Sequence, residues 1–317
     1  MTRALLRAVR LALPTEASTS ALRAALWEGE PGRAAFDRWV CQVGDPRDLP
    51  PGRRQAVREL APQLAVARQV HGASAPGALG VLLHAAADHE RRRWAPFRDA
   101  AVDLLGDEAE PLVSGGLAAA LAAHPEPALR HCHDLDRLGP RSVTATHPSG
   151  LPTEVHRGLL PPAWGADEDL DALRDRSVAE DRLGRPIRRV GVGDLLVTIL
   201  AHSIAGGRGL SVRWASDASL LARAATEDDW AVLCRTVAEH RLGPVILPPL
   251  RFVADDLRGD VPPPVVEELA ALPGPDAARS EVVMRWARRG RQHRLGSARV
   301  AARTRSRARA VRARLSR

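Results

Sequence analysis

The chain has 317 residues and a formal net charge of +8, from 46 basic and 38 acidic residues. Every basic residue is Arg, because the sequence contains no Lys, and Tyr and Asn are missing as well. A chain without Lys excludes proteins that depend on a P-loop lysine, a Schiff base or a Ser-Lys dyad. The length is sufficient for a substantial core and predicts two or three domains.

The cysteine and hydropathy patterns indicate a cytoplasmic protein. Cys41, Cys132 and Cys234 are widely spaced and form no CxxC motif, which argues against a disulfide framework and a thiolate zinc site. No uninterrupted apolar run reaches the length of about eighteen residues that a membrane-spanning helix needs. We therefore expect no membrane partner.

The positive charge is concentrated at the end of the chain. Arg279 to Arg317 contain fourteen Arg and one acid, a net charge of +13, which leaves −5 on the rest. Such a segment is typical of contacts with nucleic acid or an acidic partner. The alternative is a solvated Arg-rich extension without a partner.

Apolar periodicity and Pro/Gly punctuation predict four regions. The fold class expected is α+β, mostly helical, in which a small mixed sheet is flanked by helical modules. The regions are an N-terminal helical module (1–107), an α/β core (108–160), a C-terminal helical domain (161–275) and an Arg-rich basic tail (276–317). Helices are expected at 21–27, 34–43, 53–70, 78–105, 117–123, 195–205, 212–225, 227–240, 245–257 and 265–272. Strands are expected around 111–114, 134–136, 142–146 and 151–156, with a further pair within 177–190.

Two carboxylates in the core region indicate a metal site. Asp134 and Asp136 are two residues apart in an extended segment, so their side chains point to the same face. Glu154 lies on a strand that can pair with this segment and supply a third acid. Three acids can hold two Mg²⁺ ions. The alternatives are that the aspartates are loop acids that bind nearby arginines, and that Glu154 is a surface acid on an edge strand.

A glycine turn precedes these acids. Ser114, Gly115 and Gly116 follow a short apolar run and open an alanine-rich helix. Backbone amides at such a turn can approach phosphate oxygens closely. A glycine turn followed by paired acids therefore predicts phosphoryl or nucleotidyl transfer.

The histidines near these acids allow more than one interpretation. His131 and His133 have the spacing of two ligands on one strand face, which a zinc site would use. We favour a structural role for them, with His133 as a neighbour that tunes Asp134. For His156 and His202 the default is a buried, hydrogen-bonded histidine of the core.

The ordered motifs resemble the uncharacterised nucleotidyltransferase family of bacteria, a branch of the polymerase-β-like superfamily. The similarity covers roughly 20–272 and omits the basic tail. It runs through the glycine turn at 112–116, the segment 125–130, the acids at 134–136, the segment 151–156, the segment 193–202, and Arg213-Trp214-x-x-Asp217. The resemblance implies a minimal nucleotidyltransferase core flanked by helices. Asp134 and Asp136 would occupy the metal positions, and Glu154 that of the third acid.

The function implied is Mg²⁺-dependent transfer of an NMP group from a nucleoside triphosphate to an acceptor, either a small molecule or a protein, with release of pyrophosphate. Asp134, Asp136 and Glu154 would bind metal, while Ser114, Gly115 and Gly116 would cradle phosphate. The chain departs from the family in lacking a Lys at the glycine turn and a helix after Asp136. The alternative function is a catalytically degenerate scaffold whose basic tail contacts nucleic acid or an acidic partner.

Overall fold

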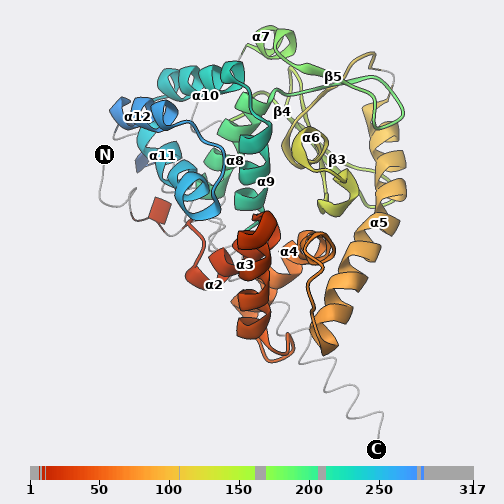
Figure 1. Ribbon diagram of the computed structural model, residues 1–317. Coiled ribbons are helices and arrows are strands. Elements are labelled where there is room, and N and C mark those ends of the chain that lie inside the picture. Colours follow the sequence, from red (N-terminus) through yellow and green to blue (C-terminus); the bar gives the residue numbers. More distant parts are fainter. Residues whose placement is uncertain are drawn as a thin grey trace, which may run out of the picture.

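The structure is a computed structural model that describes residues 12–106, 108–160, 169–205 and 212–276, together with residues 7, 9, 10, 280 and 281. The fold is mixed α+β and mostly helical, with one small sheet of six short strands (Figure 1). This agrees with the fold class predicted from the sequence. Most of the predicted Arg-rich tail, and position 164 with its tryptophan, lie outside the described residues.

The helices lie close to the positions expected from periodicity. They are α2 (Glu16–Leu26), α3 (Gly29–Val43), α4 (Pro51–Val70), α5 (Gly77–Leu105), α6 (Gly115–Ala123), α7 (Leu170–Asp175), α8 (Val192–Ala205), α9 (Arg213–Ala224), α10 (Glu227–Glu239), α11 (Gly243–Arg251) and α12 (Pro263–Ala271). A 3₁₀ turn (Pro127–Leu129) follows α6, and a π-helical turn (Phe252–Asp256) continues α11. None of the described helices is both long and apolar enough to cross a bilayer.

Local chemistry sets several helix ends. The Thr15 hydroxyl accepts a hydrogen bond from the Ser18 amide and so begins α2. Thr226 and Asp229 form a reciprocal capping box at the start of α10. Gly106, with φ +57°, ends α5 in a conformation that side chains disfavour. These caps satisfy backbone groups that the helices themselves leave unpaired.

The sheet combines parallel and antiparallel pairs. Its strands are β1 (Leu112–Val113), β2 (Leu135–Leu138), β3 (Val143–Thr146), β4 (Pro152–His156), β5 (Val178–Glu180) and β6 (Ile187–Arg189). Their order is β3-β4-β2-β1-β6-β5. The β2–β4 and β1–β6 pairs are parallel, and the other pairs are antiparallel.

The pairing of β2 with β4 positions the candidate site. The chain leaves β2 and enters β3 without a helix, and the β3–β4 hairpin then places β4 between β3 and β2. As a result Asp136 stands directly opposite Glu154 in the parallel register. The pairing forms although no helix separates β2 from β3.

The sheet extends beyond the core region predicted from the sequence. Strands β5 and β6 come from the segment assigned to the C-terminal helical domain, yet β6 pairs with β1 in the same sheet. The sequence predicted a strand pair within 177–190, but hydrophobic pattern alone does not say which strand it joins. The boundary predicted at residue 160 therefore cuts through the sheet and does not separate two domains.

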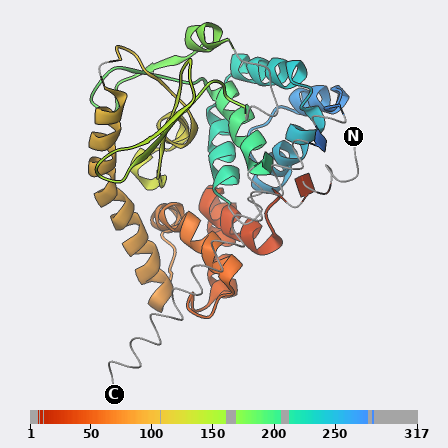
Figure 2. The same ribbon diagram turned by 180° about the vertical axis from the view of Figure 1, so that it is seen from behind.

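The sheet lies between α5 on one side and α8 with α9 on the other (Figures 1 and 2). Helix α8 is the centre of the packing, because every residue from Val192 to Leu200 is buried. A helix that is buried on all sides belongs to the core rather than to a surface layer. One hydrophobic core runs from the N-terminal helices through the sheet to α12.

Candidate functional site

Two neighbouring strands bring three metal-ligating side chains together. Asp136 comes from β2, whereas Glu154 and His156 come from β4 and are two residues apart on the same face. Each residue offers a ligand atom, and these atoms all lie within 4.8 Å of one another. The His156 Nε2 atom lies 3.2 Å from Asp136 Oδ1 and 3.6 Å from Glu154 Oε2. We call these residues the strand cluster.

The strand cluster is open to solvent. The side chains of Asp136, Glu154 and His156 are 20%, 49% and 38% exposed. An ion or a substrate can therefore reach all three. Glu154 is not on an edge strand, as the alternative interpretation had it, because β3 covers the outer side of β4.

The two carboxylates change the ionisation of His156. The hydrogen bond with Asp136 raises the pKa of His156 above its ordinary 6.5 against the opposing effect of partial burial, and the charges of Asp136, Glu154 and Asp134 add to the increase. The raised pKa thus reflects the carboxylates that face the ring.

The glycine turn packs directly against Asp136. The Ser114 amide donates a hydrogen bond to the Asp136 carbonyl oxygen at 3.0 Å. Gly115 has φ +59°, and a Cβ atom at this position would overlap the Asp136 carboxylate. Glycine is therefore required both for the backbone conformation and for the close approach. Ser114 is buried and makes no capping hydrogen bond, while Gly115 and Gly116 are partly exposed.

A buried ion pair lies next to the glycine turn. The Arg130 guanidinium lies so close to Gly116 that a Cβ atom there would overlap it. Arg130 Nη2 donates to Asp217 Oδ2 at 2.8 Å, and His124 Nε2 lies 3.0 Å from Asp217 Oδ1. All three side chains are buried. We call them the Arg130–Asp217–His124 triad.

The triad keeps Asp217 ionised. Burial alone would raise the pKa of this carboxyl, but the Arg130 charge and the hydrogen bond with His124 lower it well below its ordinary value. The triad joins the end of α6 and the segment before β2 to α9. It contacts the glycine turn through the Arg130 guanidinium beside Gly116.

The remaining predicted acid, Asp134, lies just before β2 and outside the strand cluster. Its Oδ2 atom is 3.1 Å from His133 Nε2, which agrees with the interpretation of His133 as a neighbour of Asp134. The loop alternative expected the aspartates to bind Arg130 and Arg137, but those arginines bind Asp217 and Glu108.

His131 and His133 do not form a metal site with other described residues. Their rings stack with centroids 6.0 Å apart, and His131 Nδ1 lies 2.9 Å from Glu90 Oε1. In the described part of the chain, only the strand cluster brings three potential ligands within reach of one ion. The zinc interpretation of this histidine pair therefore has no third ligand.

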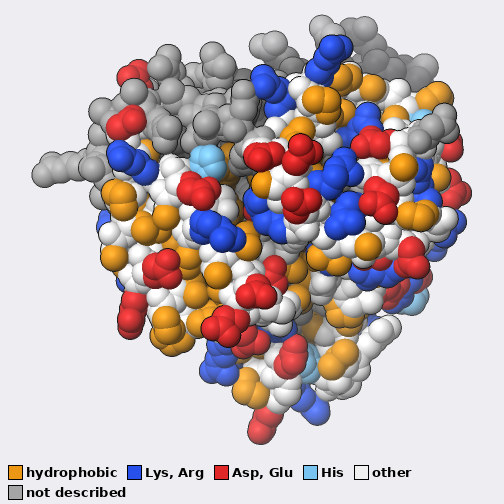
Figure 3. All heavy atoms as spheres, turned by 90° about the horizontal axis from the view of Figure 1, so that it is seen from above, with side chains coloured by type: hydrophobic (Ala, Val, Ile, Leu, Met, Phe, Trp, Pro, Cys, Tyr) orange, Lys and Arg blue, Asp and Glu red, His pale blue; other side chains and the backbone are white. Residues whose placement is uncertain are grey.

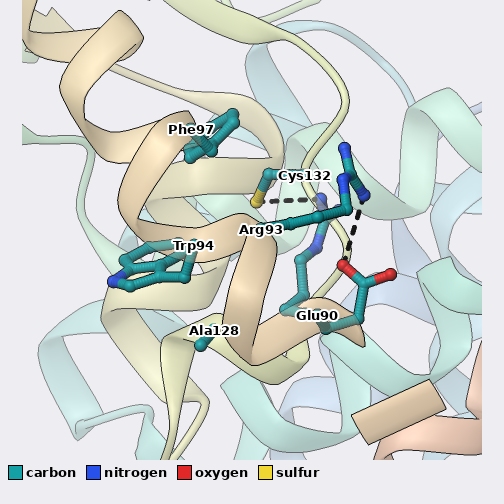
Figure 4. A pocket seen from close by; sticks show the side chains of 7 residues that line it. Glu90, Arg93, Trp94, Phe97, Ala128 and Cys132 are labelled. Carbon is teal, nitrogen blue, oxygen red and sulfur yellow. Dashed lines mark hydrogen bonds and ion pairs between the residues drawn. The ribbon is translucent and has the colours of Figure 1, made fainter. Parts of the chain in front are cut away.

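A cavity near these residues is too small for a nucleotide. It lies between α5 and the segment before β2, and Figure 4 shows the Arg93–Glu90 ion pair beside Trp94 and Phe97. Its volume of about 10 Å³ accommodates roughly one water molecule.

The face that carries α7 and α10 shows acidic and basic side chains intermixed (Figure 3). Nucleic acid binding uses surfaces of one sign, and the described residues of this face do not form one.

Sequence reasoning missed His156 and the triad. His156 was expected to be a buried core histidine, yet it is partly exposed and belongs to the strand cluster, and His202 is exposed as well. The available signal for His156 was its position two residues after Glu154 on one strand. For the triad, the signal was an aspartate in the buried face of α9.

Comparison with known proteins adds no family. No protein-family model matches the chain, and neither the curated proteins nor the solved structures contain a match.

Proposed function

We propose that the chain is a nucleotidyltransferase that uses divalent metal ions to move an NMP group from a nucleoside triphosphate to an acceptor. One observation carries the proposal. Asp136 and Glu154 face each other on adjacent parallel strands, and the turn at Gly115 packs against the Asp136 carboxylate. Carboxylates and a phosphate-binding turn are thus next to each other, as metal-assisted phosphoryl chemistry requires.

The residues present fit the metal that the resemblance implies. Carboxylate oxygens are the preferred ligands of Mg²⁺, and Asp136 and Glu154 provide them in an exposed position. Asp134, predicted as a further ligand, lies in the bend before β2 and outside the strand cluster, so the proposal places the metal on Asp136 and Glu154. When bound, one or two Mg²⁺ ions would neutralise phosphate charge and activate the acceptor oxygen.

The protein's own groups have separate tasks in the proposed reaction. The amides of Gly115 and Gly116 at the N-terminus of α6 would hold the triphosphate, while the Ser114 amide stays bonded to the Asp136 carbonyl oxygen and keeps the turn in place. The acceptor oxygen attacks the α-phosphorus, the bond from this phosphorus to the bridging oxygen breaks, and pyrophosphate leaves. Glu154 is exposed and is proposed to accept the proton of the acceptor hydroxyl.

The family that the chain resembles carries a lysine at the glycine turn, which this chain lacks. Arg130 is a basic residue beside that turn. Its guanidinium lies against Gly116 but is buried and neutralised by Asp217. It therefore positions the turn and does not replace a phosphate-binding lysine.

A second candidate is the catalytically degenerate scaffold. The observation in its favour is that His156 already pairs with both Asp136 and Glu154, so these acids have a partner within the protein. In that case the basic tail, most of which lies outside the described residues, would make the functional contacts with nucleic acid or an acidic partner.

A transfer assay distinguishes the two candidates. The full chain is incubated with each of the four α-labelled nucleoside triphosphates and Mg²⁺ or Mn²⁺, with RNA, protein and sugar acceptors, and pyrophosphate release is measured. We expect Asp136→Asn and Glu154→Gln to lower the rate by roughly 100-fold or more, because each removes a proposed metal ligand.

The matched control is Asp103→Asn, which changes an exposed acid on α5 that pairs with His147. This variant should retain the full rate. Absence of transfer with every nucleotide and acceptor class would favour the scaffold.

A further inference from the structure

The strand cluster differs from a purely acidic site in its third member. Two of its donors are carboxylates and the third is the imidazole Nε2 atom of His156, which faces both of them. Nε2 is a common metal-binding atom of histidine. We infer that His156 is a metal ligand and that the strand cluster holds a first-row transition-metal ion, with Mn²⁺ bound in preference to Mg²⁺.

The spacing of the donor atoms fits one ion. Ligand atoms bonded at ~2.1 Å, at tetrahedral or octahedral angles, lie ~3.0–3.4 Å apart. Nε2 lies 3.2 Å from the Asp136 oxygen and 3.6 Å from the Glu154 oxygen. All three ligand atoms lie within 4.8 Å of one another, close to the separations that one shared ion requires.

The backbone that carries these donors is held firmly. The Gly139 amide donates to the His156 carbonyl oxygen at 2.9 Å, which extends the β2–β4 pairing beyond the end of β2. Between the two strands, the Thr153 hydroxyl donates to the Leu135 carbonyl oxygen at 2.9 Å. Sites on paired strands keep their geometry better than sites on loops.

Donor chemistry gives the metal preference. Mg²⁺ binds almost entirely through oxygen and retains several waters, whereas imidazole favours transition metals. Mn²⁺ accepts both kinds of donor and is spectroscopically visible. This inference deepens the proposed function, because it concerns the cofactor of the same site, but metal binding can be measured without nucleotide.

The experiment uses the full chain and metal ions alone. Free Mn²⁺ is followed by electron paramagnetic resonance during titration, and Mg²⁺ is added as the competitor. Electron spin echo modulation then reports whether a ¹⁴N nucleus is bound to the ion. We expect Mn²⁺ to bind at least about tenfold more tightly than Mg²⁺ and to show a histidine nitrogen.

Three variants complete the design. His156→Ala should weaken Mn²⁺ binding by at least about tenfold and remove the nitrogen signal, because it deletes the only imidazole of the strand cluster. His156→Asp replaces nitrogen by oxygen and should move the preference towards Mg²⁺. His84→Ala, on the exposed side of α5 where His84 pairs with Asp88, should change neither measurement.

The outcomes are decisive for the inference. A wild-type protein whose bound Mn²⁺ shows no nitrogen signal overturns it, even if the variants do not fold. So does equal affinity for Mn²⁺ in His156→Ala, or no Mn²⁺ binding at all. If Mn²⁺ binds through His156 but no nucleotide is transferred, the inference stands and the proposed function fails. If transfer runs without a nitrogen ligand, the reverse holds.

Discussion

At the scale of single residues, Gly115 shows how backbone and site chemistry combine. Its φ of +59° favours glycine, and its missing side chain leaves the space that the Asp136 carboxylate occupies. The positive φ and the close contact with the Asp136 carboxylate each require glycine at this position, independently of the other.

Gly115→Ala should therefore destabilise the protein and also impair the site. We expect a loss of about 1–2 kcal/mol in the free energy of unfolding from the left-handed conformation, measured in urea. We also expect loss of metal binding, because the methyl group displaces Asp136.

The control is Gly44→Ala. Gly44 has the same φ of +59°, but nothing lies within 4 Å of a Cβ atom there. This variant should lose stability through its backbone and bind metal normally. If Gly115→Ala binds metal as well as Gly44→Ala does, the close approach to Asp136 has no functional meaning.

The residue scale also shows where prediction from sequence works. Alternation along a strand predicted that Asp134 and Asp136 share a face, but Asp134 lies in a bend before β2 and outside the strand cluster. The expected pairing of two strands did place Glu154 opposite Asp136. It did not identify His156 as their partner, because a histidine in a short strand looks the same whether it faces the core or solvent. The ring's role depends on the register of β2 against β4.

At the scale of elements, the Arg130–Asp217–His124 triad joins α6, α9 and the segment before β2. A buried pair of this kind is costly to break, because the remaining charge has no water around it. The triad therefore decides whether the glycine turn keeps its position.

Asp217→Asn should lower the free energy of unfolding by about 3–5 kcal/mol, because it leaves the Arg130 charge uncompensated. Urea denaturation measures this. The control is Glu28→Gln, which breaks the exposed ion pair with Arg223 and should cost about 1 kcal/mol or less. Equal losses in the two variants would contradict the proposed importance of the triad.

The Asp217 carboxyl makes the free energy of unfolding depend on pH. The pKa of Asp217 is lower in the folded protein than its ordinary 3.8, so unfolding at acidic pH takes up a proton. Its stabilising contribution is complete well above pH 3.8 and is lost as the pH falls through and below that value. Unfolding measured from pH 7 to pH 3 should show a steeper loss in the wild type than in Asp217→Asn.

The elements differ in how well the sequence predicted them. Helix positions followed from periodicity and from Pro and Gly punctuation, and the ends of α3, α4 and α5 lie close to the expected positions. The strands have two to five residues, too few for a period to specify their partners. The parallel pairing of β1 with β6 joins segments far apart in the chain and depends on tertiary packing.

At the scale of the whole molecule, the site lies where the sheet meets its supporting helices. The buried helix α8 and its neighbour α9 pack against α6, and α6 begins at the glycine turn. The buried core thus contacts the helix that begins at the glycine turn, while the strand cluster remains exposed. This arrangement combines a fixed glycine turn, the proposed phosphate-binding element, with an exposed strand cluster.

The most direct test of the proposed function is nucleotide binding that depends on metal. Calorimetry with non-hydrolysable α,β-methylene triphosphates should detect binding of at least one nucleotide in the presence of Mn²⁺ or Mg²⁺, and much weaker binding without metal. Asp136→Asn should weaken it by about tenfold or more, because it removes a carboxylate beside the turn. No binding of any of the four nucleotides, or equal affinity in Asp136→Asn, would contradict the proposal.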